Sequence, residues 1–359
     1  MTRDKRRFSA RFTSYRRGMA STEISELVQS VVEPYLLGGA RKYDRQQVSE
    51  LTGLPNSITR RLWVSLGFPA DPDDKAVEYS DSDIEAAKTF AKLNVLASAD
   101  IHRQTTAART LGRSMARLAE WQVDLVTEEI LARIATITKE NPDADPVEAA
   151  RVATDEVVTE FETLQRYAFR RHLDAALARS LDAGSVAGDT LRVLAVGFAD
   201  MVGYTRLTRH LEPDELSALL EAFETATSNA IVANGGWVIK NVGDEVMFAA
   251  ATASQGARIA IAVQEAAVAS HGVTQELRVG LAYGSVLQRF GDLYGSVVNT
   301  AARLTGVARP GTVLVDDGVA EAIEDDPEFT LRHLATVRVK GINRLHGHVL
   351  RRNMIRPLV

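Results

Sequence analysis

Apolar residues recur at helical spacing through most of the first half of the chain. Across Val123–Lys139 they fall three or four positions apart, which predicts an amphipathic helix. Asn141-Pro142-Asp143 should end this helix, and Asp145-Pro146 offers an N-cap and a first-turn proline for the next one. We expect that second helix to continue to about Leu181, either unbroken or with one interruption. The pattern over residues 20–182 therefore predicts an all-helical region.

The pattern changes after residues 183–190, which are small and polar, include two glycines and predict a linker. Apolar runs with strand character then alternate with amphipathic helical segments. The expected strands are 191–196, 237–242, 246–249, 277–284, 312–315, 337–340 and 348–350, and the expected helices are 213–233, 252–270 and 296–306. Strands that first alternate with helices and later come in pairs favour an α+β fold of the ferredoxin-like kind over a fully parallel sheet.

The length of the chain supports this division, because 359 residues exceed one typical core and suit two domains. An apolar fraction of 45% and a charged fraction of 25% are ordinary for a globular protein. We therefore divide the chain into a basic flexible tail over residues 1–19, a helical domain over 20–182, the linker over 183–190 and an α+β domain over 191–359.

The charge balance and the lack of cysteine exclude several classes of function. Net charge is −5, and residues 1–190 carry 26 basic against 29 acidic side chains, which argues against a general nucleic-acid binder. Without cysteine the chain can form no disulfide and no thiolate metal site. No apolar run approaches 18 residues, and residues 1–19 hold seven Arg or Lys without the apolar segment of a secretory signal. We expect a cytoplasmic, soluble protein without a membrane span.

Two aspartates are the first candidates for a functional site. Asp200 follows an apolar run, and Asp244 lies in Gly243-Asp244-Glu245 between two expected strands, 44 positions later. Two acids at one end of a sheet can hold divalent cations, and neighbouring glycines let a polyphosphate come close. Taken alone, Asp200 could equally be a helix N-cap and Asp244 a turn residue.

Three motifs extend this pattern in order along the chain. They are Phe198-Ala199-Asp200-Met201-Val202-Gly203-Tyr204-Thr205, Lys240-Asn241-Val242-Gly243-Asp244-Glu245, and Asp292-Leu293-Tyr294-Gly295 followed by residues 298–304. Together with a late Val339-Lys340-Gly341 they resemble the class III nucleotide cyclases, over residues 191 to about 350. A helical domain followed by a cyclase resembles the soluble actinobacterial members of that family, in which the leading domain regulates the catalytic one.

This resemblance implies a class III cyclase catalytic domain over residues 191–359, preceded by an all-α regulatory domain. It also implies an adenylyl cyclase that converts ATP to cyclic AMP and pyrophosphate, with two divalent cations, Mg²⁺ or Mn²⁺, in each active site of a homodimer. One cation would activate the ribose 3′-hydroxyl and the other would hold the departing pyrophosphate. The resemblance assigns the metals to Asp200 and Asp244, and phosphate contacts to the backbone amides of Met201, Val202, Gly203 and Tyr204.

Lys240 and Asp292 are the residues expected to select the base. Adenine offers an acceptor at N1 and a donor at N6, which match a lysine and a carboxylate. Guanine reverses both contacts, and each unpaired polar group would cost about 1–3 kcal/mol. Without the neighbouring motifs, Lys240 could be a solvated lysine at a strand edge and Asp292 a turn residue.

Asn299 and Arg303 are four positions apart and share one helix face. The resemblance makes Asn299 orient the ribose and Arg303 stabilise charge on the reacting phosphate. It directs Lys340 to the terminal phosphates, although an ordinary surface lysine is the alternative. In the family the two aspartates come from one protomer and the other side chains from its partner.

Other interpretations stay open for the helical region. Residues 44–68 resemble a winged, MerR-like helix-turn-helix, so a transcriptional regulator that only binds nucleotide is an alternative, as is a guanylyl cyclase. The acidic balance argues against DNA contact. The helix that ends at residues 170–181 is a transmitter or a rigid connector. A proton, sensed by His172, His210 or His333, or a small molecule such as a lipid in an apolar pocket, is the candidate regulator.

Overall fold

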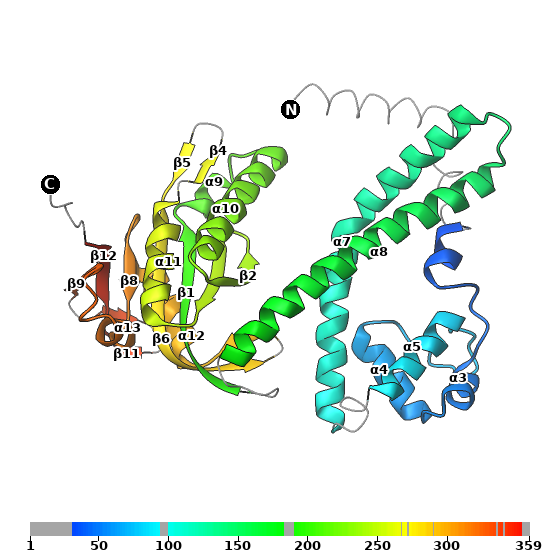
Figure 1. Cartoon of the computed structure of the whole chain (residues 1–359), viewed down its shortest axis with the longest axis horizontal. Helices are drawn as coiled ribbons and strands as arrows, with labels where there is room; N and C mark the ends of the chain where they lie inside the picture. The colour runs from blue at the N-terminus through cyan, green and yellow to red at the C-terminus, as the bar shows by residue number, and fades with distance from the viewer. Residues whose placement is uncertain are drawn as a thin grey trace. The chain divides into compact units, whose positions relative to one another are not determined.

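The computed structural model describes residues 31–93, 100–182, 190–266, 268–270, 273–289, 291–334, 337–339 and 342–353 (Figure 1). The basic tail, nearly all of the linker and Lys340 lie outside the described residues. Contacts within the chain divide it into two units, Met1–Leu177 and Ala178–Val359.

The first unit is helical, as the sequence predicts. Its helices are α3 (Arg45–Thr52), α4 (Asn56–Leu66), α5 (Asp81–Lys92), α7 (Ile101–Glu140) and α8 (Pro146–Asp182), the last of which ends in the second unit. The helix expected over Val123–Lys139 is the second half of α7. The helix expected after Asp145 is α8, which runs without interruption.

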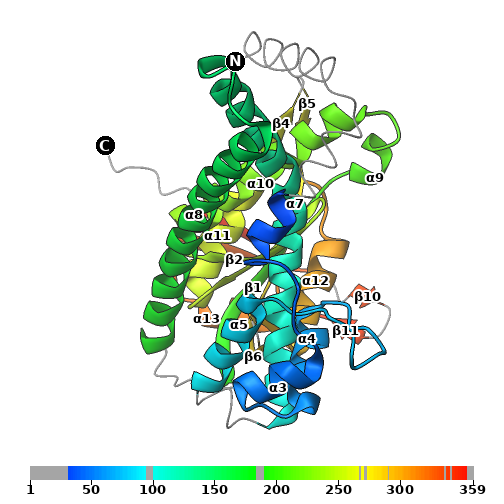
Figure 2. The ribbon, with the colours of Figure 1, turned by 90° about the vertical axis from the view of Figure 1, so that its right-hand side faces the viewer.

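Helices α3 and α4 form the segment that resembles a helix-turn-helix. The Asp44 side chain caps α3 by accepting from the Gln47 amide, and Gly53 ends the helix with φ of 72°. Helices α3, α4 and α5 gather around the first part of α7 (Figures 1 and 2). At the crossing of α4 and α7, a Cβ on Gly112 would overlap the Leu66 carbonyl, so glycine sets how closely these helices pack.

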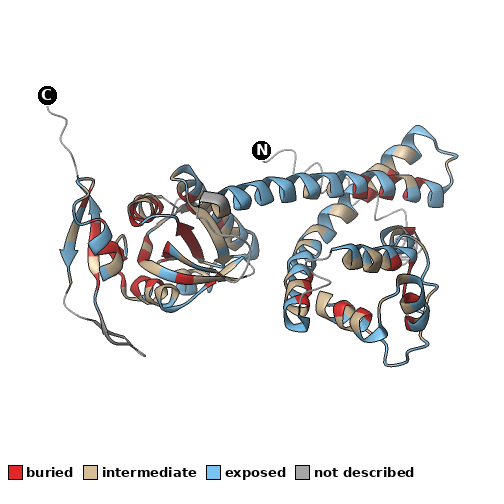
Figure 3. Cartoon of the chain, turned by 60° about the horizontal axis from the view of Figure 1, so that its bottom comes forward, coloured by how far each residue is buried: buried red, intermediate tan, exposed pale blue. Residues whose placement is uncertain are grey.

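Helices α7 and α8 pack as an antiparallel pair around a small core that contains Ile130, Ile134, Ala153 and Val157. Arg133 of α7 adds hydrogen bonds to two glutamates of α8. Residues 166–178 of α8 are all exposed (Figure 3). Among the described helices, none has the length and apolar character needed to cross a bilayer.

The core of the second unit is a β-α-β-β-α-β arrangement, which confirms the predicted α+β, ferredoxin-like fold class. Its elements are β1 (Thr190–Met201), α10 (Pro213–Ala233), β2 (Trp237–Val242), β3 (Glu245–Ala250), α11 (Ala253–Glu265) and β6 (Leu277–Arg289). The strands lie in the order β2-β3-β1-β6, and neighbours are antiparallel. Because β2 and β3 form a hairpin beside β1, the ends of all three strands meet at one edge.

Further strands extend this sheet. Strand β8 (Val313–Val315) pairs with β6 in parallel, and β12 (His348–Arg352) and β9 (Phe329–His333) follow, while β7 (Asp292–Tyr294) pairs with the end of β6. The remaining elements are α9 (Tyr204–Leu207), β4 (Val268–Ser270), β5 (Val273–Gln275), α12 (Ser296–Val307), α13 (Asp317–Ala322), β10 (Val337–Val339) and β11 (Ile342–Leu345).

The helix expected over 252–270 is wrong at its C-terminal end. It stops at Glu265, and residues 268–270 pair with β5 in a hairpin that contacts α10 (Figures 1 and 2). The alanine-rich sequence continues the helical pattern past Glu265. Residues 268–270 nevertheless form a strand, because they pair with β5 and contact α10.

The sheet is buried on both faces. Helices α10 and α11 cover one face around Phe223, Phe248 and Ile259, and α12 covers the other around Phe198 and Ala301. Helix α12 lies very close to β1 and β6. A Cβ on Gly280 would overlap the backbone of α12, and the Thr305 hydroxyl donates to the Phe198 carbonyl at 3.1 Å.

Candidate active site

The hairpin between β2 and β3 brings Asp200 and Asp244 to the same end of the sheet. Asp200 is the penultimate residue of β1 and lies opposite Glu245 in the antiparallel register. Asp244 occupies the hairpin turn, where Gly243 has φ of 61°. The Met201 amide donates to the Asp244 carbonyl at 3.0 Å and fixes the turn against β1. The two predicted metal ligands are therefore neighbours.

Three acids, Asp200, Asp244 and Glu245, lie at this end of the sheet together with Arg278, and we call this group the acid corner. The Arg278 Nε donates to Asp200 Oδ2 at 2.6 Å, and the Asp200 side chain is only 15% exposed. Burial, and then the charge of Asp200, raise the pKa of Asp244. Burial and the same neighbours also raise the pKa of Glu245. A single guanidinium thus offsets only part of the negative charge, which favours binding of a further cation.

The chemistry of this corner fits a metal that is shared with a substrate. Among the described residues no group of three or more His, Asp or Glu side chains is arranged to hold a metal alone. The Asp200 and Asp244 carboxylates are hard oxygen ligands, and Mg²⁺ commonly takes one or two carboxylates and completes its shell with phosphate oxygens and water. Mn²⁺ favours the same donors.

The turn after Asp200 offers fewer free amides than the sequence suggested. The Met201 amide donates to the Asp244 carbonyl, and the Val202 amide donates to the Glu276 carbonyl, both at 3.0 Å. Gly203 has φ of 79°, and Tyr204 opens α9. The prediction of phosphate contacts therefore no longer includes the amides of Met201 and Val202 and is limited to those of Gly203 and Tyr204.

Lys240 and Asp292 form an ion pair on the face of the sheet that carries α12. Lys240 Nζ lies 2.8 Å and 3.0 Å from the two carboxylate oxygens of Asp292. Lys240 comes from β2 and Asp292 from β7, and both side chains are partly exposed. A cationic donor and an anionic acceptor thus lie side by side, as a base-reading pair requires.

Helix α12 carries the last two described candidates. Asn299 is exposed and Arg303 is half-buried one turn further on. Within the described part of the chain Arg303 makes no ion pair, so its charge stays available. Nor does any hydrogen bond or ion pair among described residues join the acid corner to Asn299 or Arg303.

Arg278 is the residue that the sequence analysis missed. It stands at the start of β6, opposite Asp200 in the register of β1 and β6. The available signal was a charged side chain in Leu277-Arg278-Val279-Gly280, near the start of an otherwise apolar strand. A partly buried arginine needs a partner for its charge, and an acid at the end of a neighbouring strand supplies one.

Comparison with known proteins agrees with this geometry. Residues 188–352 match the adenylate and guanylate cyclase catalytic domain. A protein named adenylate cyclase from Streptomyces coelicolor is 36% identical over 292 residues, which cover 81% of this chain and 74% of that protein. Another protein named adenylate cyclase, from Glutamicibacter nicotianae, is 31% identical over 336 residues, which cover 89% of this chain and 81% of that protein.

A protein of Mycobacterium tuberculosis named pH-sensitive adenylate cyclase is 29% identical over 320 residues, which cover 86% of this chain and 78% of that protein. These matches extend well beyond the catalytic domain and into the helical unit. The chain belongs to the adenylate and guanylate cyclase family.

Proposed function

We propose that this protein is an adenylate cyclase that converts ATP to 3′,5′-cyclic AMP and pyrophosphate. The observation that carries the choice of substrate is the Lys240–Asp292 pair, held at 2.8 Å in the same unit as the acid corner. The relatives named adenylate cyclase support the same activity. The cytoplasmic location stays a prediction from the sequence.

Asp200 and Asp244 hold the divalent cations, Mg²⁺ or Mn²⁺, two in each site. When bound, these cations lower the pKa of the ribose 3′-hydroxyl and offset charge on the departing pyrophosphate. Arg278 holds Asp200 in place before the nucleotide arrives. The amides of Gly203 and Tyr204 contact the phosphates.

Lys240 donates to adenine N1, and Asp292 accepts from the N6 amino group. Their mutual ion pair would open to admit the base, and the two new hydrogen bonds replace it. GTP would leave both side chains facing groups of the wrong polarity, which costs enough for a strong preference.

Asn299 orients the ribose, and Arg303 stabilises the charge that develops on the α-phosphate. Lys340, which lies outside the described residues, contacts the terminal phosphates. The acid corner and the residues on α12 belong to different sites of a two-fold homodimer, so each site takes its acids from one protomer and its base-reading and α12 residues from the partner.

The helical unit regulates turnover in this proposal. Helix α8 ends in the second unit, where the Arg179 guanidinium lies 5.0 Å from the centre of the Trp237 ring and Ser180 accepts from Arg192 at 3.2 Å. Trp237 begins β2, the strand that carries Lys240. A change at the end of α8 would therefore reach the base-reading pair. Regulation by protons is a hypothesis that the relative named pH-sensitive supports.

The test is to incubate the purified chain with Mn²⁺ and equal concentrations of ATP and GTP, and to measure cyclic AMP and cyclic GMP. We expect cyclic AMP in large excess. Asp200→Ala and Lys240→Ala chains should each be inactive, and mixing them should restore part of the activity through one complete site. Predominant cyclic GMP would contradict the choice of substrate, and no recovery on mixing would contradict shared sites.

A further inference from the structure

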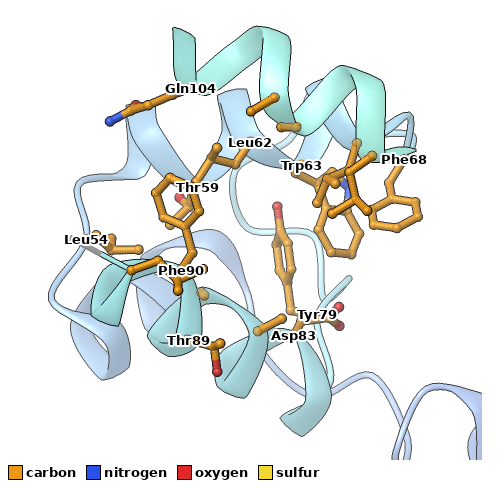
Figure 4. Close-up of a pocket in the computed structure, with 17 residues that line it drawn as sticks. Leu54, Thr59, Leu62, Trp63, Phe68, Tyr79, Asp83, Thr89, Phe90 and Gln104 are labelled. Carbon is orange, nitrogen blue, oxygen red and sulfur yellow. The ribbon is translucent and has the colours of Figure 1, made fainter. Parts of the chain in front are cut away.

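The helical unit contains an apolar cavity of about 440 Å³ (Figure 4). Its walls come from α4, α5 and α7, and its lining includes Leu62, Trp63, Phe90 and Ala108. A volume of this size is typical of sites for small molecules. This apolar lining does not specify an occupant, so a small-molecule regulator stays a prediction from the sequence. For the proton, the other candidate regulator, the second unit offers a defined group of side chains.

Three histidines gather around one aspartate at the end of β9 and the start of β12. His333, the last residue of β9, lies opposite His348, the first residue of β12, and their ring centres are 4.9 Å apart. Asp317 lies 3.5 Å from His346 Nδ1 through one carboxylate oxygen and 2.9 Å from His348 Nε2 through the other. The rings of His333 and His346 are 6.4 Å apart. We call these four residues the histidine cluster.

Few other charges face the histidine cluster. Within the described part of the chain, Asp317 is the only carboxylate at ion-pair distance from these rings. Asp316 bonds to two backbone amides instead, and burial raises its pKa to about 6, so it loses charge in acid. Strand β8 holds only apolar residues, and Arg352 of β12 lies near glutamates of α11 and of the segment before β9. Arg332, next to His333, points to the other face of the sheet.

The histidine cluster lies at the base of the β10–β11 hairpin. This hairpin is the segment of the chain between His333 and His346. At the same base the Leu334 amide donates to the Gly347 carbonyl at 3.0 Å. Residues 335–345 contain no acid and three basic residues, Arg338, Lys340 and Arg344. The hairpin therefore supplies no negative charge that could offset protons added to the cluster.

Protonation changes the balance of charge in this cluster. Imidazole is the side chain that ordinarily changes charge between pH 5 and 8. With all three rings protonated, the cluster holds three positive charges against one negative charge. His346 and His348 can share Asp317, whereas His333 makes no ion pair within the described residues and faces His348 directly. Like charges directly opposite each other on neighbouring strands destabilise the pairing of those strands.

We infer that the histidine cluster is a pH-sensitive switch, in which neutral rings keep the base of the β10–β11 hairpin closed and protonation in mild acid loosens it. The turn of this hairpin holds Lys340. An effect on turnover therefore rests on the proposed function, in which Lys340 contacts the terminal phosphates. Loosening of the hairpin would weaken that contact and raise KM for ATP.

Amide hydrogen exchange of the full-length chain without nucleotide tests the switch independently of catalysis. In peptides within residues 329–352, corrected for the intrinsic pH dependence of exchange, we expect protection to fall roughly threefold to tenfold from pH 7.5 to pH 5.5. His333→Gln cannot ionise and should remove most of this fall. Asp317→Asn removes the negative charge and should enlarge it. His210→Gln, at an exposed histidine of the same unit, should match the parent chain. Asp316 titrates in all these chains, so its effect cancels in the comparison.

Protection that is independent of pH in the parent chain, or an equal fall in the parent and His333→Gln, would overturn the switch. His346→Gln removes a charge at a second position, should His333→Gln fold poorly. The link to turnover is tested separately, by KM for ATP at both pH values. The rise in KM in acid should be smaller in His333→Gln than in the parent chain. An equal rise, together with the expected exchange result, would support the switch and contradict the proposed role of Lys340.

Discussion

Arg278 and Asp200 face each other across two antiparallel strands, and the Arg278 Nε donates to Asp200 Oδ2 at 2.6 Å. The sequence motifs identify Asp200 as a candidate metal ligand, but they do not identify Arg278. Since Asp200 is mostly buried and lies beside Asp244 and Glu245, the Arg278 guanidinium offsets part of the repulsion among the three carboxylates.

Arg278→Ala should therefore destabilise the protein without metal by about 1–3 kcal/mol, because it leaves a buried carboxylate unpaired. Added Mn²⁺ should restore much of the loss, since a cation can replace the missing charge. Thermal melts with and without Mn²⁺ measure this. The control is Arg258→Ala, which removes a more exposed ion pair with Glu328 and should show no rescue by Mn²⁺. Equal behaviour of the two variants would contradict the prediction.

Asp292→Asn should relax the choice between ATP and GTP. The amide can rotate to offer either a donor or an acceptor, so the penalty against guanine falls and the ratio of kcat/KM values for ATP and GTP should drop by about tenfold or more. Initial rates with both nucleotides measure it. Glu328→Gln changes a surface ion pair of the same unit and should leave the ratio as it is. An unchanged ratio in Asp292→Asn would remove Asp292 from base recognition.

Thr305 should position α12 rather than contact the substrate. It is 1% exposed, and its hydroxyl bonds to the Phe198 carbonyl of β1, next to the strand end that carries Asp200. Thr305→Val should lower kcat several-fold while KM for ATP changes little, and Thr305→Ser should recover it. Thr227→Val removes an equally buried hydroxyl that bonds within α10. That control should lose similar stability, about 1 kcal/mol, without the loss of kcat. A parallel loss of kcat in both variants would indicate general destabilisation.

Asp316 should make stability depend on pH. Burial raises the pKa of Asp316 to about 6, well above the value of about 3.9 for an exposed aspartate. The folded state therefore holds this proton more tightly than the unfolded state, so its contribution to stability is present below about pH 4 and is lost as the pH rises to about 6.

Asp316→Asn keeps the oxygen that accepts from the Val319 and Tyr283 amides but cannot ionise. At pH 8 it should be more stable than the parent chain by about 1–3 kcal/mol, and the advantage should shrink toward pH 4. Urea unfolding at both pH values measures the difference. A gap that does not change with pH would show that Asp316 is not responsible.

Local pattern revealed most of the elements and one half of the candidate site. Helical spacing located α7 and α8, and a strand followed by a hairpin was enough to bring Asp200 and Asp244 together. These features depend on residues near one another in the chain. They are therefore visible as periodicity and as turn residues.

Features that depend on distant pairing were not visible. Arg278 meets Asp200 only through the register of β1 and β6, which are far apart in the sequence. The cavity needs side chains from α4, α5 and α7 to converge, and no single window contains them. The engagement of the Val202 amide by Glu276 likewise follows from tertiary packing. The pattern of side chains along the sequence does not show which backbone amides already donate a hydrogen bond in the folded protein.

Helix α8 is unbroken from Pro146 to Asp182, and the boundary between the two units falls within it. A continuous helix advances about 100° and 1.5 Å with every residue. Inserting a single residue after Leu164 would thus rotate the rest of the chain by a little more than a quarter of a revolution, whereas inserting seven would return it almost to the starting angle. For the regulation proposed above, the length of such an insertion should therefore alternate between permitting and blocking the response of turnover to the helical unit.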